Sequence, residues 1–325
     1  MINSVRKLLI EQLVTGQFIS GQELGERLGI SRSAVSKHID ALANMGLDVY
    51  RVTGKGYRIA EPVVLLDPNK IKQAMLRKND QLVVEVKGTL DSTNDYFLRQ
   101  LDKPLTPGQV CLAEYQKSGR GRRGRQWVSP FGSHIYLSMY WYLEQGLATA
   151  MGLSVVAALA IKDAIKALYQ IEVELKWPND VYIQGQKVAG VLIDLEGQAL
   201  EPCHSVIGIG INVNMPSQSA ENIDQPWTDL QSHYQQKIDR NGLTAKLIDC
   251  LLIRLEEHQQ QGISNMLVDW HEADKYLGKP IRIITGTNET IGVCRGINDQ
   301  GALLLEVNGI VKVIYGGEVS LRAAL

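Results

Sequence analysis

The chain has 325 residues, with 34 Lys and Arg against 35 Asp and Glu, so its formal net charge is −1. Apolar residues make up 45% of it and charged residues 21%, which is typical of a globular protein and excludes a disordered chain or a uniformly basic one. The length predicts about two domains, or three small ones.

The cysteines and the hydropathy pattern predict a cytoplasmic protein without a membrane partner. The four cysteines are far apart and form no CxxC pair, so free thiols are expected rather than a zinc site or disulfides. The N-terminus lacks the basic and apolar segments of a secretory signal. The most apolar stretch, residues 153–168, contains Lys162, Asp163 and Lys166 and is too short to span a bilayer.

Residues 1–60 have the pattern of three helices followed by a hairpin. Apolar residues recur at helical spacing in the segments 8–14, 24–28 and 35–42. Residues 47–59 then alternate like two strands around a glycine-rich turn. This order is the outline of a winged helix-turn-helix.

The third of these helices has the side chains of a DNA-recognition helix. Its first turns carry short polar and cationic residues with no acid before Asp40, and residues 1–60 hold eight Lys and Arg against five Asp and Glu. Such side chains contact base edges and phosphates, so DNA is the expected partner; a winged helix used only for protein contacts is the alternative. The residues expected to contact DNA are Ser31, Arg32, Ser33, Ser36, Lys37 and Lys55.

The middle of the chain mixes strands and helices, and the end is all strand. Residues 60–68 predict a short linker. The predicted strands are 82–86, 110–114, 134–142, 172–177, 181–184, 187–196 and 205–212, and the predicted helices are 95–100, 148–169 and 243–259. Four short strands follow Gly278, and Asn308-Gly309 between two of them predicts a type I′ hairpin in a small SH3-like barrel.

The segment Lys117–Arg125 holds five cations, three glycines and no acid. Five like charges in nine residues repel one another, so we expect this loop to be mobile until an anion binds. Glycine lets backbone N–H groups point at a phosphate, and Arg adds paired donors. A phosphate-bearing small molecule is the preferred ligand; a nucleic-acid arm and a solvated loop are the alternatives. The GxGxxG match at Gly119 is no dinucleotide fingerprint, because residues 126–132 cannot begin a helix.

Further motifs combine neutral polar and cationic side chains. Ser92, Thr93 and Asn94 suit an uncharged polar ligand such as a urea, or simply cap a helix. Lys176 and Lys187 lie on adjacent predicted strands; either they meet an anionic ligand or they are exposed at a sheet edge. Asp180 could pair with Lys176, whereas Lys187 has no obvious acid beside it.

Two glycines and a tryptophan could each have either a ligand-binding or a structural role. Gly208 and Gly210 within a predicted strand indicate a close approach of a ligand or another backbone, or a bulge. Trp227 could stack on a purine or be a buried anchor. The six histidines form no HxxxH pair, so no metal-ligand cluster is expected.

Together these motifs resemble the biotin–protein ligase family. The segments DSTN at 91–94, GRGRRGR at 119–125, KWPND at 176–180, KVAG at 187–190 and GIGIN at 208–212 occur in the order of that family. With the winged helix in front, the whole chain resembles its bifunctional members, which also repress the biotin operon. The resemblance implies an α+β protein: a winged helix at 1–62, a catalytic domain of class II synthetase type at 63–275 and an SH3-like domain at 276–325.

The resemblance also implies an activity. The family makes biotinyl-5′-AMP from biotin and ATP with Mg²⁺, and then passes biotin to a lysine of the biotin carboxyl carrier protein. The adenylate acts as corepressor for a homodimer bound to operator DNA. A ligand-sensing repressor without ligase activity, and a ligase for lipoate, are the alternatives.

Matching motifs carry the family's site residues to this chain. The residues implied for biotin are Ser92, Thr93, Asn94, Gln116, Arg120, Gly121, Arg122 and Lys187. Those implied for ATP or the adenylate are Arg120, Arg122, Asn179, Asn212 and Trp227, and the catalytic set is Lys187, Arg122, Lys176 and Asp180. The stretch 215–226, with Pro216 and Pro226, matches no family motif.

Overall fold

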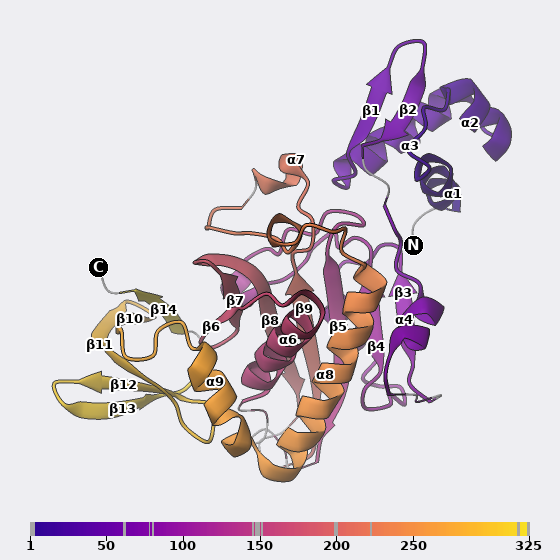
Figure 1. The fold of residues 1–325 in the computed structure, drawn as a ribbon. Helices are drawn as coiled ribbons and strands as arrows, with labels where there is room; N and C mark the ends of the chain where they lie inside the picture. The colour runs from indigo at the N-terminus through magenta and orange to yellow at the C-terminus, as the bar shows by residue number, and fades with distance from the viewer. Residues whose placement is uncertain are drawn as a thin grey trace.

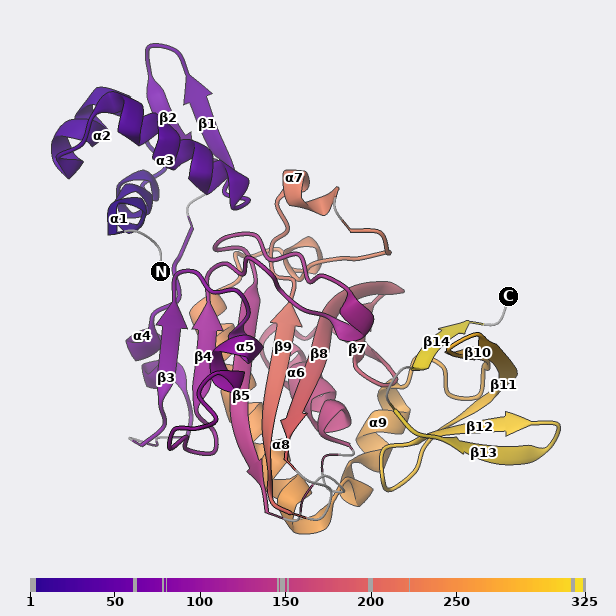
Figure 2. The ribbon, with the colours of Figure 1, turned by 180° about the vertical axis from the view of Figure 1, so that it is seen from behind.

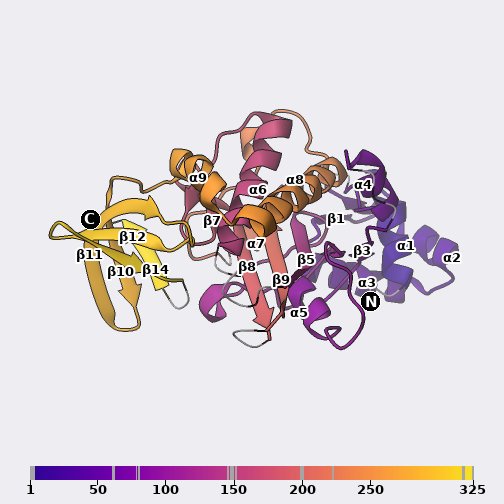
Figure 3. The same ribbon diagram turned by 90° about the horizontal axis from the view of Figure 1, so that it is seen from below.

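The computed structural model describes residues 4–60, 63–77, 79, 81–144, 146, 150, 152–197, 201–221, 223–316 and 319–323. A small helical body and a small sheet lie at opposite ends of a central sheet with helices on both faces (Figure 1 and Figure 3). This arrangement confirms the predicted α+β class. The boundary predicted after residue 62 falls at residues 61 and 62, which lie outside the described residues.

The N-terminal body is the predicted winged helix. It contains α1 (Ser4–Leu13), α2 (Gly21–Leu28), α3 (Arg32–Asn44), β1 (Val49–Val52) and β2 (Gly56–Ile59). Ser20 and Ser31 cap α2 and α3 by accepting hydrogen bonds from Glu23 N and Ala34 N. Leu24, Val35, Ile39 and Leu42 are buried between the helices, as the helical periodicity predicts.

The central sheet has seven strands in the order β3-β4-β5-β9-β8-β7-β6. They are β3 (Val84–Lys87), β4 (Val110–Ala113), β5 (Ile135–Leu143), β6 (Glu174–Lys176), β7 (Asp180–Ile183), β8 (Gln186–Glu196) and β9 (Cys203–Ile211). Strands β3 and β4 are parallel and their neighbours are antiparallel. Each strand overlaps a predicted one.

Helices cover both faces of this sheet. Helices α6 (Leu153–Tyr169) and α8 (Arg240–Gln261) pack together on one face, and α5 (Thr93–Leu98) lies on the other (Figure 2). The predicted helix 148–169 begins at Leu153, with residues 147–149 and 151 outside the described part, and α5 begins two residues before the predicted start. The sequence did not predict α4 (Pro68–Ala74), the short α7 (Ser217–Ala220) or α9 (Leu267–Ala273). None of the described helices is long and apolar enough to cross a membrane.

The C-terminal sheet has the order β13-β12-β11-β10-β14. Its strands are β10 (Pro280–Thr285), β11 (Asn288–Ile297), β12 (Leu303–Val307), β13 (Ile310–Ile314) and β14 (Val319–Ala323). Asn308 and Gly309 have φ of 52° and 79°, which confirms the predicted turn. Strand β14 was not predicted. The four cysteines are buried free thiols, as expected.

The connection between the winged helix and the central body is packed rather than free. Leu66 is buried, and its N–H donates to Glu114 at 2.5 Å. Arg240 donates to the carbonyl oxygen of Val64 at 2.8 Å and forms a buried ion pair with Glu114 at 2.7 Å. Residues 63–66, within the short, semi-stiff linker predicted at 60–68, are therefore fixed against the central body.

One residue of the central body lies in the core of the winged helix. Phe131 is buried among Leu9, Ile39 and Leu42, and its N–H donates to the carbonyl oxygen of Met45 at 2.8 Å. Because Phe131 follows the basic loop 117–125 by six residues, the two bodies are packed together close to that loop.

Candidate active site

A cavity of about 840 Å³ opens on the central sheet. Its lining comes from the segment 92–94, the basic loop, β7, β8, the glycines of β9, residues 223–227 and β14. It brings together all thirteen residues that the resemblance implied for catalysis, biotin and the adenylate.

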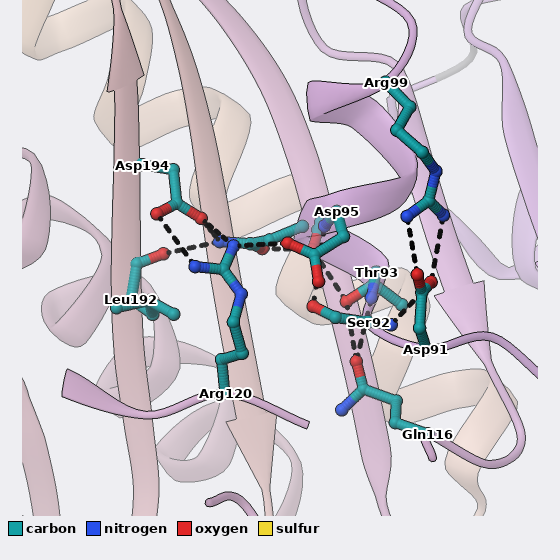
Figure 4. A network of polar contacts seen from close by, with 11 residues as sticks. Asp91, Ser92, Thr93, Asp95, Arg99, Gln116, Arg120, Leu192 and Asp194 are labelled. Atoms are coloured by element: carbon teal, nitrogen blue, oxygen red, sulfur yellow. Dashed lines mark hydrogen bonds and ion pairs between the residues drawn. The ribbon is translucent and has the colours of Figure 1, made fainter. Parts of the chain in front are cut away.

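The neutral polar side chains form one end of the cavity. Thr93 donates from its N–H and its hydroxyl to Gln116 Oε1, at 2.9 and 3.2 Å, and Gln116 Nε2 donates to Ser129 Oγ at 3.1 Å. The Ser138 hydroxyl lies 2.7 Å from Thr93 Oγ1 and 2.5 Å from Asn94 Oδ1. Figure 4 shows Thr93 and Gln116 close together at the start of α5. Ser92 caps α5, which confirms the capping alternative; ligand binding by this segment stays a prediction.

The two glycines of β9 make room for neighbouring side chains. A Cβ on Gly208 would overlap the Asn94 amide, and one on Gly210 would lie 2.5 Å from the Trp127 ring. The ladders from β9 to β5 and β8 run without a bulge. The bulge is therefore wrong. The groups that approach these glycines closely are side chains, not another backbone, and the approach of a ligand stays a prediction.

The basic loop is held by acids and amides from other segments. Arg120 forms ion pairs with Asp95 at 2.7 Å and Asp194 at 2.6 Å, and Arg122 donates to Asn179 Oδ1 at 3.1 Å. Burial lowers the pKa of Arg122. The loop contains no acid of its own, but Arg120 has carboxylate partners from other segments. The predicted mobility of the loop in the absence of ligand stays a prediction.

The lysines form the cationic end of the cavity. Lys187 pairs with Asp180 at 2.6 Å, and both side chains are largely buried. The sequence had placed Asp180 with Lys176 and left Lys187 without an acid; this assignment is wrong. Lys176 is half-buried rather than exposed. Its partial burial lowers its pKa, and the cations Lys187 and Arg322 add to the effect. Excess positive charge is thus concentrated where an anionic ligand would neutralise it.

Trp227 and Asn212 lie beside Lys187. The Lys187 N–H donates to the carbonyl oxygen of Pro226 at 3.1 Å, and Thr228 N–H donates to that of Lys187 at 2.9 Å. Asn212 Nδ2 donates to the Thr228 carbonyl oxygen at 3.0 Å. Trp227 is half-buried and lines the cavity. Residue 222, within the unmatched stretch 215–226, lies outside the described residues.

Sequence reasoning missed four lining or supporting residues. Trp127, Ser138 and Asp194 belong to no motif, and Arg322 comes from β14 in the C-terminal sheet. The indole of Trp127 lies under Lys187, whose Nζ is 5.5 Å from the ring centroid. Alternation along the strands indicates which of these side chains share a face, but not which cavity that face lines.

The residues predicted to contact DNA lie in the winged helix. Arg32, Ser33, Ser36 and Lys37 are in α3, and Lys55 is in the turn between β1 and β2. Ser31 is the N-cap of α3, which occupies its hydroxyl. Arg58 lies over the rings of Phe18 and Tyr50, at 5.0 and 5.1 Å.

Comparisons with known proteins agree with this geometry. The Biotin/lipoate A/B protein ligase family model matches residues 86–212, a helix-turn-helix domain model matches 5–58, and the biotin protein ligase C-terminal domain model matches 276–322. The bifunctional ligase/repressor BirA of Salmonella typhimurium is 46% identical over 316 residues, which are 97% of each chain. The chain belongs to the biotin–protein ligase family.

Other members of this family support the assignment. BirA of Escherichia coli strain K12 is 45% identical over 322 residues, which cover 99% of this chain and 98% of that one. The structure of the biotin protein ligase from Aquifex aeolicus in complex with biotin and ATP has a TM-score of 0.62 and 27% identity. The matched region covers 74% of this chain and 99% of the Aquifex aeolicus chain.

Proposed function

We propose that this chain activates biotin with ATP to biotinyl-5′-AMP and transfers biotin to a lysine of the biotin carboxyl carrier protein. The observation that carries this proposal is a single cavity with a neutral polar end and a cationic end. Biotin is neutral at its ureido ring and anionic at its carboxylate, and ATP adds further negative charge.

The neutral end fits the ureido ring. Asn94, Thr93 and Gln116 offer donors and acceptors without net charge, which match a group that both donates and accepts. Gly208 and Gly210 let Asn94 and Trp127 pack closely on β9, and the Trp127 indole gives the cavity an apolar wall. Lipoate, with an apolar ring, has no N–H or carbonyl group at its ring to exchange hydrogen bonds with these side chains.

The cationic end fits the reacting anions. A carboxylate oxygen of biotin attacks the α-phosphate of ATP; one P–O bond forms, and the bond to the pyrophosphate oxygen breaks. Two anions must approach each other, so Lys187, Arg122 and Lys176 stabilise the charge that develops on the phosphate oxygens. Asp180 positions Lys187 through their 2.6 Å ion pair. The reaction therefore needs no protein nucleophile.

Mg²⁺ fits this site as an ion bound together with the nucleotide phosphates. No group of three or more His, Cys, Asp and Glu side chains among the described residues could hold a metal alone. Mg²⁺ commonly binds through substrate phosphates with one or two carboxylates, and Asp180 and Asp224 line the cavity. When bound, the ion neutralises phosphate charge.

The basic loop protects the product. Biotinyl-5′-AMP is a mixed anhydride that water hydrolyses, so a loop that covers it until the carrier lysine arrives preserves it. Arg120 and Arg122 link the loop to β8 and to the 177–179 turn. The lysine amine then attacks the carbonyl carbon, the amide forms and AMP leaves.

The same chain represses the biotin operon as an adenylate-bound dimer. Strand β9 pairs with β8 along Ala189–Glu196, but β7 pairs with it only along Gln186–Gly190. One edge of residues 192–196 therefore has no strand partner in the described structure and supports pairing with a second copy. If adenylate favours the dimer and the dimer binds operator DNA, each event strengthens the other. Because the proposed partners are operator DNA and the biotin carboxyl carrier protein, we expect this protein to act in the cytoplasm.

Pyrophosphate exchange tests the ligase directly. Purified chain is incubated with ATP, Mg²⁺ and labelled pyrophosphate, together with biotin, lipoate or no acid. Exchange that depends on biotin supports the proposal. Exchange that depends on lipoate identifies the other ligase, and no exchange with either acid identifies a repressor that only senses ligand.

A further inference from the structure

Arg120 of the basic loop is held by two acids from different elements. Its guanidinium lies between Asp95 on α5 and Asp194 on β8, at 2.7 and 2.6 Å (Figure 4). Both contacts use a terminal nitrogen of the guanidinium, while the buried Nε has no hydrogen-bond partner in the protein. A buried donor without a partner is costly, so an acceptor that reached this N–H would remove that cost, and Arg120 lines the cavity.

Asp194 also fixes the amide of Asn94. Asn94 Nδ2 donates to Asp194 Oδ2 at 2.8 Å and to the carbonyl oxygen of Leu192 at 3.2 Å. Both amide protons are then used on β8, and the amide oxygen is directed the other way, toward the Ser138 hydroxyl. Without the carboxylate, the amide could rotate and present its NH₂ group to the cavity instead.

We propose that Asp194 is a positioning residue for the ureido end of the ligand, an inference that rests on the proposed function. One carboxylate orients both the Arg120 guanidinium, whose Nε donor has no partner in the protein, and the Asn94 amide, whose oxygen accepts from the Ser138 hydroxyl and keeps a second lone pair for a ligand N–H group. A ureido ring needs a donor for its carbonyl oxygen and acceptors for its N–H groups. Asp194 touches neither the ring nor the reacting atoms.

The proposed role distinguishes Asp194 from two nearby acids, Asp95 and Glu196. Asp95 pairs with Arg120, whereas the Asn94 amide donates to Asp194 and Leu192, so Asp95 helps to orient only the guanidinium. Glu196 is on the same strand and, two residues further, on the same face, but it is exposed. Glu196→Gln therefore removes the same charge from β8 without disturbing the cavity.

The experiment measures biotin binding by calorimetry without ATP, and the KM for biotin and for ATP by pyrophosphate exchange. Asp194→Ala is expected to raise the Kd and the KM for biotin about tenfold or more, the effect of losing one or two charge-assisted hydrogen bonds. The KM for ATP and the kcat at saturating biotin should stay within about threefold, because bound biotin still meets the same cations. Asp95→Asn should have a smaller effect, and Glu196→Gln none.

Two results would overturn the inference. One is a Kd for biotin in Asp194→Ala equal to that of the unsubstituted chain. The other is a loss of kcat, or of ATP affinity, as large as the loss of biotin affinity, which would indicate general damage to the fold. Failure of the unsubstituted chain to bind biotin would instead reject the proposed function, so the two failures are distinguishable.

Discussion

Replacing Phe131 with Ala tests the packing between the winged helix and the central body. Phe131 belongs to the central body but is buried among the winged-helix residues Leu9, Ile39 and Leu42. Removal of a buried Phe side chain costs about 3–5 kcal/mol. A domain of about 60 residues has a total stability of about 3–9 kcal/mol at the usual value per residue. The substitution should therefore remove much of the stability of residues 4–60.

Hydrogen exchange and activity measured together check this expectation. In Phe131→Ala, amides of α1, α2 and α3 should exchange much faster, whereas those of β5, β8 and β9 should change little. Operator binding should weaken strongly, and biotin-dependent pyrophosphate exchange should persist. Phe97→Ala is the matched control: Phe97 is equally buried, but in a separate cluster beneath α5, so it should destabilise the central body and leave α1–α3 protected. Unchanged protection of α1–α3 in Phe131→Ala would refute the reasoning.

Three further predictions concern the pH dependence of stability, the space beside Gly208 and the retention of biotinyl-5′-AMP. Burial lowers the pKa of His134 from 6.5 to about 4, so the folded state favours the neutral imidazole. The contribution of His134 to the free energy of unfolding is present above pH 6.5 and falls by up to about 3 kcal/mol as the pH drops toward 4. Urea unfolding at several pH values should show this slope, and His134→Asn should flatten it; equal slopes would contradict the assignment. Gly208→Ala would place a Cβ 2.9 Å from Asn94 Cγ and should weaken biotin binding at least about tenfold, and unchanged calorimetry would show that the site adapts. Arg122→Ala loses its contact with Asn179 and should release free biotinyl-5′-AMP into solution; full retention would argue against loop closure.

Local patterns were sufficient to predict most of the elements. Ser20 and Ser31 cap helices, Gly29 ends α2 with a φ of 66°, and Asn308-Gly309 forms its hairpin, because each depends on a few neighbouring residues. Strand β14 was missed because the apolar and polar residues of 319–323 alternate over only five positions, which is too short a pattern to identify a strand by itself. It is recognisable only through its pairing with β10.

The contacts between distant segments could not be predicted. Asp180 pairs with Lys187 in a hairpin whose register shifts between Val181 and Tyr182, and such an irregularity has no spacing pattern of its own. Asp194 lies 74 residues from Arg120, its partner. Its role depends on the order of strands in the sheet, which the sequence does not specify.

The motifs located the cavity because each is a short segment whose residues stay together. The lining residues of 92–94, 119–125, 176–180 and 187–190 meet around one cavity. What the motifs do not contain is the support beneath them: Ser138 below Asn94, and Trp127 beside Gly210. These supports are single residues on long strands or loops, where chemistry alone does not separate them from ordinary core residues.

Oxygen transfer from biotin to AMP tests the central claim most directly. Biotin labelled with ¹⁸O at both carboxylate oxygens is supplied with ATP, Mg²⁺ and the carrier protein, and AMP, pyrophosphate and the biotinylated carrier are analysed by mass spectrometry. If the carboxylate attacks the α-phosphate, one ¹⁸O appears in AMP, one remains in the amide and none enters pyrophosphate. Unlabelled AMP alongside biotinylated carrier, or label in pyrophosphate, would contradict the adenylate route.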